Sequence, residues 1–339
     1  MKVFISACSV GNGHLIQSIA VKQYLESKKY DVMGIFAAKK NKGFPKFFTD
    51  EFSNIVKFDG FDFVFDNKSR VIIWKTVLRN IIIFPQLFLS FIKICNTIRK
   101  QKPDTIINHY DPLVGLSALF FGKRIKYISI AHQYAMTLPM YPSIEGFTFQ
   151  KLFIRILNSI TSIQSQKVAL SYYKFTDNKV IACPPILRRE SYELSNAVED
   201  FVLVYLMNED MLPQLIDEAK RYPNVKVECF TKLTKPFESC DNVKVHGLDG
   251  KLFMNRMRVC KAVICSGGFE TTSEAILHKK PVLMVPLPNH YEQYANCNDA
   301  YIHNLALYSS RIDFTKIPTS QLGDTNWFNN TYEVLNKLI

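Results

Sequence analysis

The feature that most constrains the fold is an alternation of short apolar runs with helix-like segments along the chain. The first series starts with KVFISAC and HLIQSIAVKQYLESKK and continues through YDVMGIFAA, DTIINHY and IKYISIAH. Strand, helix, strand order is typical of a parallel sheet that helices cover on both faces. The sequence therefore predicts an α/β fold built on parallel strands.

This alternation is interrupted once and then restarts, which indicates two domains. Residues 183–191, CPPILRRES, contain two adjacent prolines that stiffen the segment and stop any helix before them. At 339 residues the chain is also longer than one ordinary core fills. We expect similar α/β domains at 1–185 and 186–322, with a cleft between them at the carboxyl ends of the strands, and a helix within 323–339.

The composition fits a globular protein without a metal or disulfide framework. Hydrophobic residues make up 47% of the chain and charged residues 21%. The eight cysteines are scattered and form no CxxC pair, so we expect buried reduced thiols. The chain begins directly with a strand and a turn, without the cleavage site of a signal peptide. We therefore expect a cytoplasmic protein.

A glycine turn in the second series is the most informative motif. A strand ends in Ser266, Gly267 and Gly268, and we expect a helix to begin near Thr271. Glycines let the backbone approach a ligand closely, and the unpaired N–H groups at a helix start favour phosphate. Ser266 and Thr271 add hydroxyl groups. Glu274, expected in the first helical turn, is either a favourable charge there or a carboxylate that accepts from ribose hydroxyls.

Residues 263–297 resemble the nucleotide-sugar site of GT-B glycosyltransferases, above all family 28, which includes the lipid II-forming N-acetylglucosaminyltransferases. The shared pattern is a glycine turn, a Ser-Glu-Ala helix, a strand that runs into a proline, and an acidic-Gln-x-x-Asn segment. The resemblance implies two Rossmann-like domains that face a central cleft, with the donor bound in the second domain. It also implies that the terminal helix packs back on the first domain.

The same resemblance implies a role for each residue of the donor site. Those around the diphosphate would be Gly267, Gly268, Phe269 and Thr271, and Glu274 would hold the ribose. The sugar would face Glu292 and Gln293, and the base would lie against the backbone of His246 and Gly247.

The first glycine turn, GNGH at residues 11–14, is similar to the turn that opens the acceptor domain in these enzymes. It lacks the Gly-x-Gly-x-x-Gly spacing of a dinucleotide site. It is still more similar to the turn of a subgroup of uncharacterised predicted glycosyltransferases, which also tend to carry an Asp-aromatic-Glu-Pro segment and a His-Gln pair. The acceptor or cleft residues implied here are Gly11, Asn12, Gly13, Asp111, His132 and Gln133. An acidic residue is usual at position 109 in this pattern, where this chain has histidine, so the chain departs from the pattern at the position that an acid–histidine relay would use.

His14 is the candidate catalytic residue. A histidine can take a proton at neutral pH, as the general base of a sugar transfer must. The alternative is a histidine that caps the turn or packs beneath it. With the donor motif present, we favour His14 as general base or acceptor contact. We expect His278, beside Lys279 and Lys280, at the surface.

No metal or organic cofactor is expected besides the nucleotide sugar itself. Asp59, Asp62 and Asp66 do not form a tight Asp-x-Asp motif, and no other set of oxygen ligands suggests a divalent cation. Backbone N–H groups at a helix start can stabilise a departing diphosphate without a metal.

Two apolar stretches with interspersed cations, 69–100 and 147–159, lie in the expected first domain. The first is too short between its charges for a transmembrane helix, and we expect two amphipathic helices that meet at Pro85. Both stretches suit either the surface of an anionic membrane or a core with a basic solvated face. The net charge of +12 favours the membrane slightly. Nucleic acid is disfavoured because the basic residues are spread and no recognition motif is present.

The sequence therefore predicts a glycosyltransferase, more narrowly a hexosyltransferase. It would move a sugar from a nucleoside diphosphate, with UDP as the first candidate, to an acceptor hydroxyl. Inversion at the sugar is implied by the resemblance alone. The acceptor would be lipid-linked or membrane-associated if the basic stretches touch the inner face of a membrane. The alternatives are a UDP-sugar epimerase or hydrolase of the same fold, and a non-catalytic nucleotide-sugar-binding subunit.

Overall fold

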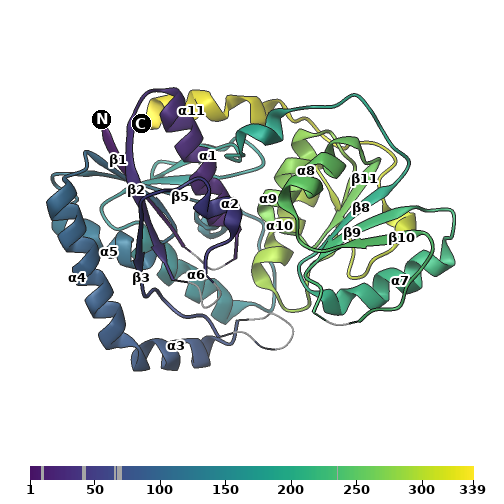
Figure 1. Cartoon of the computed structure of the whole chain (residues 1–339), viewed down its shortest axis with the longest axis horizontal. Coiled ribbons are helices and arrows are strands. Elements are labelled where there is room, and N and C mark those ends of the chain that lie inside the picture. Colours follow the sequence, from purple (N-terminus) through teal and green to yellow (C-terminus); the bar gives the residue numbers. More distant parts are fainter. Residues whose placement is uncertain (9–10, 40–42, 65, 67–70, 235) are drawn as a thin grey trace.

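The protein is built from two parallel sheets that lie in separate halves of the molecule (Figure 1). This is the expected α/β arrangement. The computed structural model describes residues 1–8, 11–39, 43–64, 66, 71–234 and 236–339.

The first half is a seven-stranded sheet in the order β3-β2-β1-β4-β5-β6-β7, with every pair parallel. Its strands are β1 (Lys2–Ala7), β2 (Asp31–Ala38), β3 (Ile55–Phe58), β4 (Thr105–His109), β5 (Lys126–Ala131), β6 (Gln166–Leu170) and β7 (Val180–Cys183). Its helices are α1 (Gly13–Ser27), α2 (Lys46–Thr49), α3 (Ile73–Ile82), α4 (Phe84–Gln101), α5 (Pro112–Phe121) and α6 (Thr148–Thr161). The strand order reverses between β1 and β4, which is where ligands bind in open sheets of this kind.

The second half is a six-stranded parallel sheet in the order β10-β9-β8-β11-β12-β13. Its strands are β8 (Val202–Leu206), β9 (Val227–Thr231), β10 (Val243–His246), β11 (Ala262–Cys265), β12 (Val282–Met284) and β13 (Leu307–Tyr308). Its helices are α7 (Leu212–Arg221), α8 (Gly250–Val259), α9 (Phe269–Leu277) and α10 (Tyr291–Ile302). The corresponding reversal lies between β8 and β11, and α9 and α10 run along the boundary with the first half (Figure 1).

Short 3-10 helices occupy several connections: η1 (His132–Thr137), η2 (Arg189–Tyr192), η3 (Glu209–Met211), η4 (Phe314–Lys316) and η5 (Asn326–Asn330). The chain then ends in α11 (Thr331–Leu338), which lies beside α1 in Figure 1. The Tyr24 hydroxyl donates to Asn336 Oδ1 at 2.8 Å, and Lys126 Nζ donates to the Leu338 carbonyl at 2.6 Å. The last helix is therefore bonded to the first half of the molecule.

The central strands are buried on both faces, as continuous apolar runs require in a parallel sheet. Val3, Phe4 and Ile5 of β1 and Val263 and Ile264 of β11 have no exposed surface. All eight cysteines are free in the structure; seven of them are buried, as expected, and Cys240 is half-buried.

The expected pair of helices at Pro85 is confirmed by α3 and α4, which meet at a bend of 70°. Pro85 occupies the first turn of α4, where its missing N–H costs nothing. Within the described residues no single helix is long and apolar enough to cross a membrane, and the bent pair reaches that length and hydropathy only jointly. Residues 69 and 70 of the predicted stretch lie outside the described residues.

Candidate active site

Two glycine turns, one from each half, carry the site. Gly11 follows β1 with a φ of +72°, and Gly267 follows β11 with a φ of +76°. A Cβ on Gly267 would lie 2.9 Å from Cys297 Sγ and 3.1 Å from the Gln293 carbonyl, so only glycine fits there. Gly268 is exposed and has open space at its Cβ position. A ligand can therefore approach the backbone at the start of α9.

His14 lies in the first turn of α1 and is half-buried. Its ring stacks on Tyr110 with a centroid distance of 5.5 Å, and its Nδ1 lies 3.3 Å from Gln17 Oε1. Burial lowers the pKa of His14 to about 4, against a raising effect of the Gln17 contact. The ring is therefore neutral at physiological pH, which is the state a general base needs.

Gln17 connects the two halves of the molecule at this point. Its Nε2 donates to Glu270 Oε1 at 2.6 Å, so α1 is bonded to the first turn of α9. Burial raises the pKa of Glu270 to about 8, with Gln17 opposing that shift. The sequence analysis did not identify Gln17 or Glu270 as residues of the site. For Gln17 the available signal was its i, i+3 spacing from His14, which places the two side chains on one face of the helix.

His132 makes a second contact between the halves. Its Nδ1 lies 2.8 Å from the Leu170 carbonyl and its Nε2 lies 2.7 Å from Asn296 Oδ1. The ring stacks on Phe269 with a centroid distance of 3.9 Å, and Asn296 Nδ2 donates to the Gly267 carbonyl at 3.0 Å. Burial lowers the pKa of His132. The structure thus places His132 against the second glycine turn.

The two residues predicted to face the sugar, Glu292 and Gln293, point in different directions. Gln133 Nε2 donates to Glu292 Oε1 at 3.2 Å, so Glu292 faces the first half, and burial raises the pKa of its carboxyl. Gln293 turns into its own half, because its Oε1 accepts from the Leu287 N–H at 2.8 Å.

Glu274 is hydrogen-bonded to the proline-containing segment 183–191, the connector between the two halves. Its Oε1 accepts from Ser191 Oγ at 3.1 Å and from Arg188 Nη2 at 3.4 Å. The expected start of this helix near Thr271 is wrong by two residues, because the glycine turn itself forms the boundary and α9 begins at Phe269. Glu274 therefore lies in the second turn, while Thr271 is half-buried in the first.

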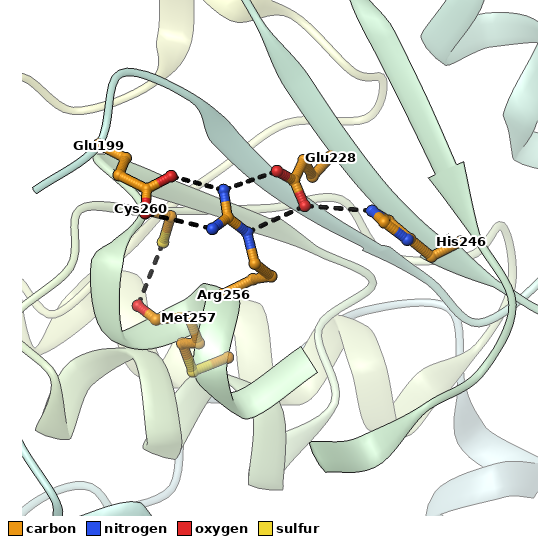
Figure 2. Close-up of polar contacts among 6 residues, drawn as sticks. All are labelled: Glu199, Glu228, His246, Arg256, Met257 and Cys260. Carbon is orange, nitrogen blue, oxygen red and sulfur yellow. Dashed lines mark hydrogen bonds and ion pairs between the residues drawn. The ribbon is translucent and has the colours of Figure 1, made fainter. Parts of the chain in front are cut away.

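His246, at the end of β10, belongs to a polar network with Glu228, Arg256 and Glu199 (Figure 2). Its Nε2 lies 3.1 Å from Glu228 Oε2, and its ring stacks on Phe230 at 4.6 Å. Arg256 donates to Glu228 at 2.6 and 3.0 Å and to Glu199 at 2.7 and 3.2 Å. These bonds fix the side chain of His246, and Gly247 beside it has open space at its Cβ position.

Other predicted residues have structural partners. Asp111 caps α5 by accepting from the Val114 N–H at 3.0 Å, and burial raises its pKa to about 7. Ser266 Oγ accepts from the Met207 N–H at 3.2 Å. Gly11 and Asn12 are exposed in the turn before α1, and Gly13 begins that helix.

Two histidines outside the predicted site are also informative. The expectation that His278 lies at the surface is wrong: it follows the last residue of α9 as its C-cap and is only 7% exposed. His109 is fully buried at the end of β4, and neither of its ring nitrogens has a hydrogen-bond partner in the structure. Burial lowers the pKa of His109 to about 3, so it offers a neutral ring where the resemblance expects an acid. Within the described ranges no group of three or more His, Cys, Asp or Glu side chains could hold a metal ion.

A family model described as glycosyl transferase family 1 matches residues 1–324. No curated protein sequence matches the chain. Similar solved structures include the glycotransferase of kitacinnamycin, with 12% identity, a TM-score of 0.61, and coverage of 99% of this chain and 93% of that one.

Two further solved structures cover 99% of this chain. Acinetobacter baumannii MurG has 14% identity and a TM-score of 0.55 over 90% of its own length. Phytolacca americana UGT2, complexed with UDP-2fluoro-glucose and pterostilbene, has 10% identity and a TM-score of 0.61 over 93% of its length. At such identities the likeness shows the fold, which is the expected GT-B arrangement of two parallel sheets. Since the family model spans nearly the whole sequence, the chain belongs to glycosyl transferase family 1 and is a glycosyltransferase.

Proposed function

We propose that this protein transfers a sugar from a nucleoside diphosphate, UDP first among the candidates, to an acceptor hydroxyl, without a metal and with inversion. The observation that carries the proposal is the meeting of the two glycine turns. A neutral His14 opens α1 in one half, an unobstructed Gly268 precedes α9 in the other, and the Gln17–Glu270 bond joins the two helix starts.

The donor diphosphate would bind at the start of α9. The first N–H groups of a helix lack intrahelical partners, and together with the positive end of the helix they suit a phosphate and stabilise negative charge as the diphosphate leaves. Two similar structures hold ligands of this class: UGT2 contains UDP-2fluoro-glucose, and the rhamnosyltransferase SpnG contains thymidine diphosphate. A donor held this way needs no cation for the departure of the diphosphate.

His14 would take the proton from the acceptor. The acceptor oxygen attacks the anomeric carbon as its proton passes to a ring nitrogen of His14. The bond from that carbon to the diphosphate breaks on the opposite side, and its electron pair stays on the phosphate oxygen. Attack opposite the leaving group inverts the anomeric centre.

The acceptor would be presented at a membrane surface by α3 and α4. Large apolar side chains stand exposed on both helices, with Trp74 64%, Ile81 65% and Leu89 66% exposed. Lys75 and Arg79 lie on the same pair of helices. Exposed apolar residues flanked by cations suit an anionic lipid surface, so we propose a peripheral location on the cytoplasmic side.

Thermal unfolding in the presence of UDP, GDP or dTDP tests the donor assignment. A ligand that binds the folded state raises the melting temperature with the logarithm of its concentration over its Kd. We expect one of the three nucleotides to stabilise the protein selectively. If none does at millimolar concentration, the proposed donor class is wrong. Incubation with the donor alone, followed by analysis of the sugar, separates transfer from epimerisation or hydrolysis.

A further inference from the structure

Three side chains form a continuous hydrogen-bonded chain from His14 to the second half of the molecule. His14 Nδ1 lies 3.3 Å from Gln17 Oε1, and Gln17 Nε2 donates to Glu270 Oε1 at 2.6 Å. We propose that Gln17 is a positioning residue, through which Glu270 of the second half sets the tautomer of His14 in the first half. This inference rests on the proposed function for the role of His14 as a base.

The polarity of the chain follows from the chemistry of its groups. Burial raises the pKa of Glu270 to about 8, so this carboxyl is largely protonated at neutral pH, and Oε1 accepts the bond as the oxygen without the hydrogen. The NH₂ group of Gln17 therefore faces Glu270 and its carbonyl oxygen faces His14. An amide oxygen only accepts, and a neutral imidazole carries a single N–H. The hydrogen of His14 therefore lies on Nδ1. The Nε2 atom keeps its lone pair, which is the atom available to take a proton from an acceptor.

Among the described residues, the polar contact of the His14 ring is Gln17 Oε1, an amide oxygen and not a carboxylate of the first half. Position 109, where the resemblance expects an acid, holds His109, a buried ring whose nitrogens have no partner. Tyr110 stacks on the His14 ring and restricts its plane, and its hydroxyl is used to donate to Asn158 Oδ1 at 2.7 Å. The orienting group thus comes from α9, through Gln17.

The contact also depends on how the halves sit against each other. Gln17 belongs to α1 and Glu270 to α9, so separation of the halves breaks the 2.6 Å bond. The amide of Gln17 then loses the partner that fixes its orientation. The tautomer of His14 with its hydrogen on Nδ1 is therefore fixed only while the second half, which would carry the donor, is closed on the first. This arrangement couples donor-domain closure to preparation of the base.

Nitrogen NMR of ¹⁵N-histidine-labelled full-length protein tests the tautomer without reference to activity. The His14 signals are assigned by their loss in His14→Gln. We expect a protonated Nδ1 and an unprotonated Nε2 in the wild type at neutral pH. In Gln17→Ala, this single tautomer should give way to a mixture. A wild-type ring protonated on Nε2, or a Gln17→Ala spectrum equal to that of the wild type, would overturn the proposal.

Two further variants separate positioning from loss of structure. Gln17→Glu keeps an acceptor for His14 Nδ1–H but loses the donor to Glu270, so it should keep the tautomer and move the acidic limb of the pH–rate profile upward. Gln23→Ala is the matched control, because Gln23 lies on the same helix and accepts from the Arg189 N–H at 2.9 Å in the connector. Its histidine spectrum and rate should equal those of the wild type. If Gln23→Ala shifts the His14 signals as Gln17→Ala does, the effect is a general one of helix α1 and the proposal fails.

Kinetics then connect the tautomer to the reaction. We expect Gln17→Ala to lower kcat by about tenfold to a hundredfold with little change in donor KM, a part of the 10²–10⁴ that a general base contributes. An unchanged kcat would show that the Gln17 contact does not serve the base. A wild-type protein that transfers no sugar from any nucleotide donor would overturn the proposed function, while the NMR result on Gln17 would stand or fall by itself.

Discussion

The two glycine turns of this protein share a backbone design and differ in their side chains. Each follows a central strand, contains a glycine with a φ between +72° and +76°, and leads into a helix at the boundary between the halves. Gly11 has open space at its Cβ position, whereas Gly267 is wedged against Cys297 and Gln293. The glycine turn of the first half leads directly to His14 at the start of α1, whereas the glycine turn of the second half has the exposed residue Gly268, which has no side chain. The shared turn therefore places a residue at the boundary between the halves, and the side chain that follows the glycine determines what chemistry that position can perform.

The largest effect should come from removing the side chain that distinguishes the first turn. We expect His14→Ala to lower kcat by about 10²–10⁴, the contribution of a general base. Donor affinity, measured by nucleotide titration, should stay nearly unchanged because the donor belongs to the second turn. A rate equal to that of the wild type would remove the distinction we draw between the turns.

The second prediction compares the glycines directly. Gly267→Ala combines backbone strain with a clash against Cys297 Sγ and should cost about 2–4 kcal/mol in the free energy of unfolding. Gly11→Ala meets no atom within 4 Å, so only its positive φ is strained, at about 1 kcal/mol. Urea unfolding of both variants checks this order. Equal losses would mean that the packing at Gly267 is not what fixes the second turn.

His14 and Glu270, which follow the first and second glycine turns, should change the unfolding free energy with pH in opposite directions. The pKa of His14 is lowered to about 4, so the unfolded state binds more protons and stability rises between pH 4 and 6.5. The pKa of Glu270 is raised from 4.5 to about 8, so its contribution is fully present below pH 4.5 and is lost as pH rises through 8. Between pH 6.5 and 8.5 the wild type should lose about 1–2 kcal/mol more unfolding free energy than Glu270→Gln, since one pKa unit is worth about 1.4 kcal/mol. Parallel pH profiles of the two proteins in urea unfolding would contradict this.

Substitutions at exposed apolar residues of the two halves should have the smallest effect on stability. Ile81→Glu and Leu89→Glu change exposed residues and should alter the unfolding free energy by no more than about 0.5 kcal/mol. Both should nevertheless reduce flotation with anionic liposomes. Ile302→Glu is the control, because Ile302 is an exposed apolar residue, 58% accessible, on α10 in the second half; this variant should float like the wild type. Wild-type protein that does not float would remove the proposed membrane surface.

Much of the fold was predictable because its signals are local. The alternation of apolar runs and helical segments predicted two parallel sheets, and Pro85 predicted the junction of α3 and α4. The two glycine turns were also visible, since each follows a strand directly. The helix after the second turn was placed two residues late, because the position of its first turn depends on the backbone of Gly267 and Gly268.

The two sheets, the two glycine turns and the histidine that follows the first turn could all be read from local sequence, because strand periodicity and turn chemistry act over a few neighbouring residues. The hydrogen-bond partners of these groups, by contrast, follow from the packing of the two halves. It joined Gln17 to Glu270, 253 residues further along the chain, set His132 against Asn296, and bound Glu274 to the connector. It also buried His278. Such contacts depend on how two separately folded sheets pack against each other, and no local pattern in either sheet encodes that geometry.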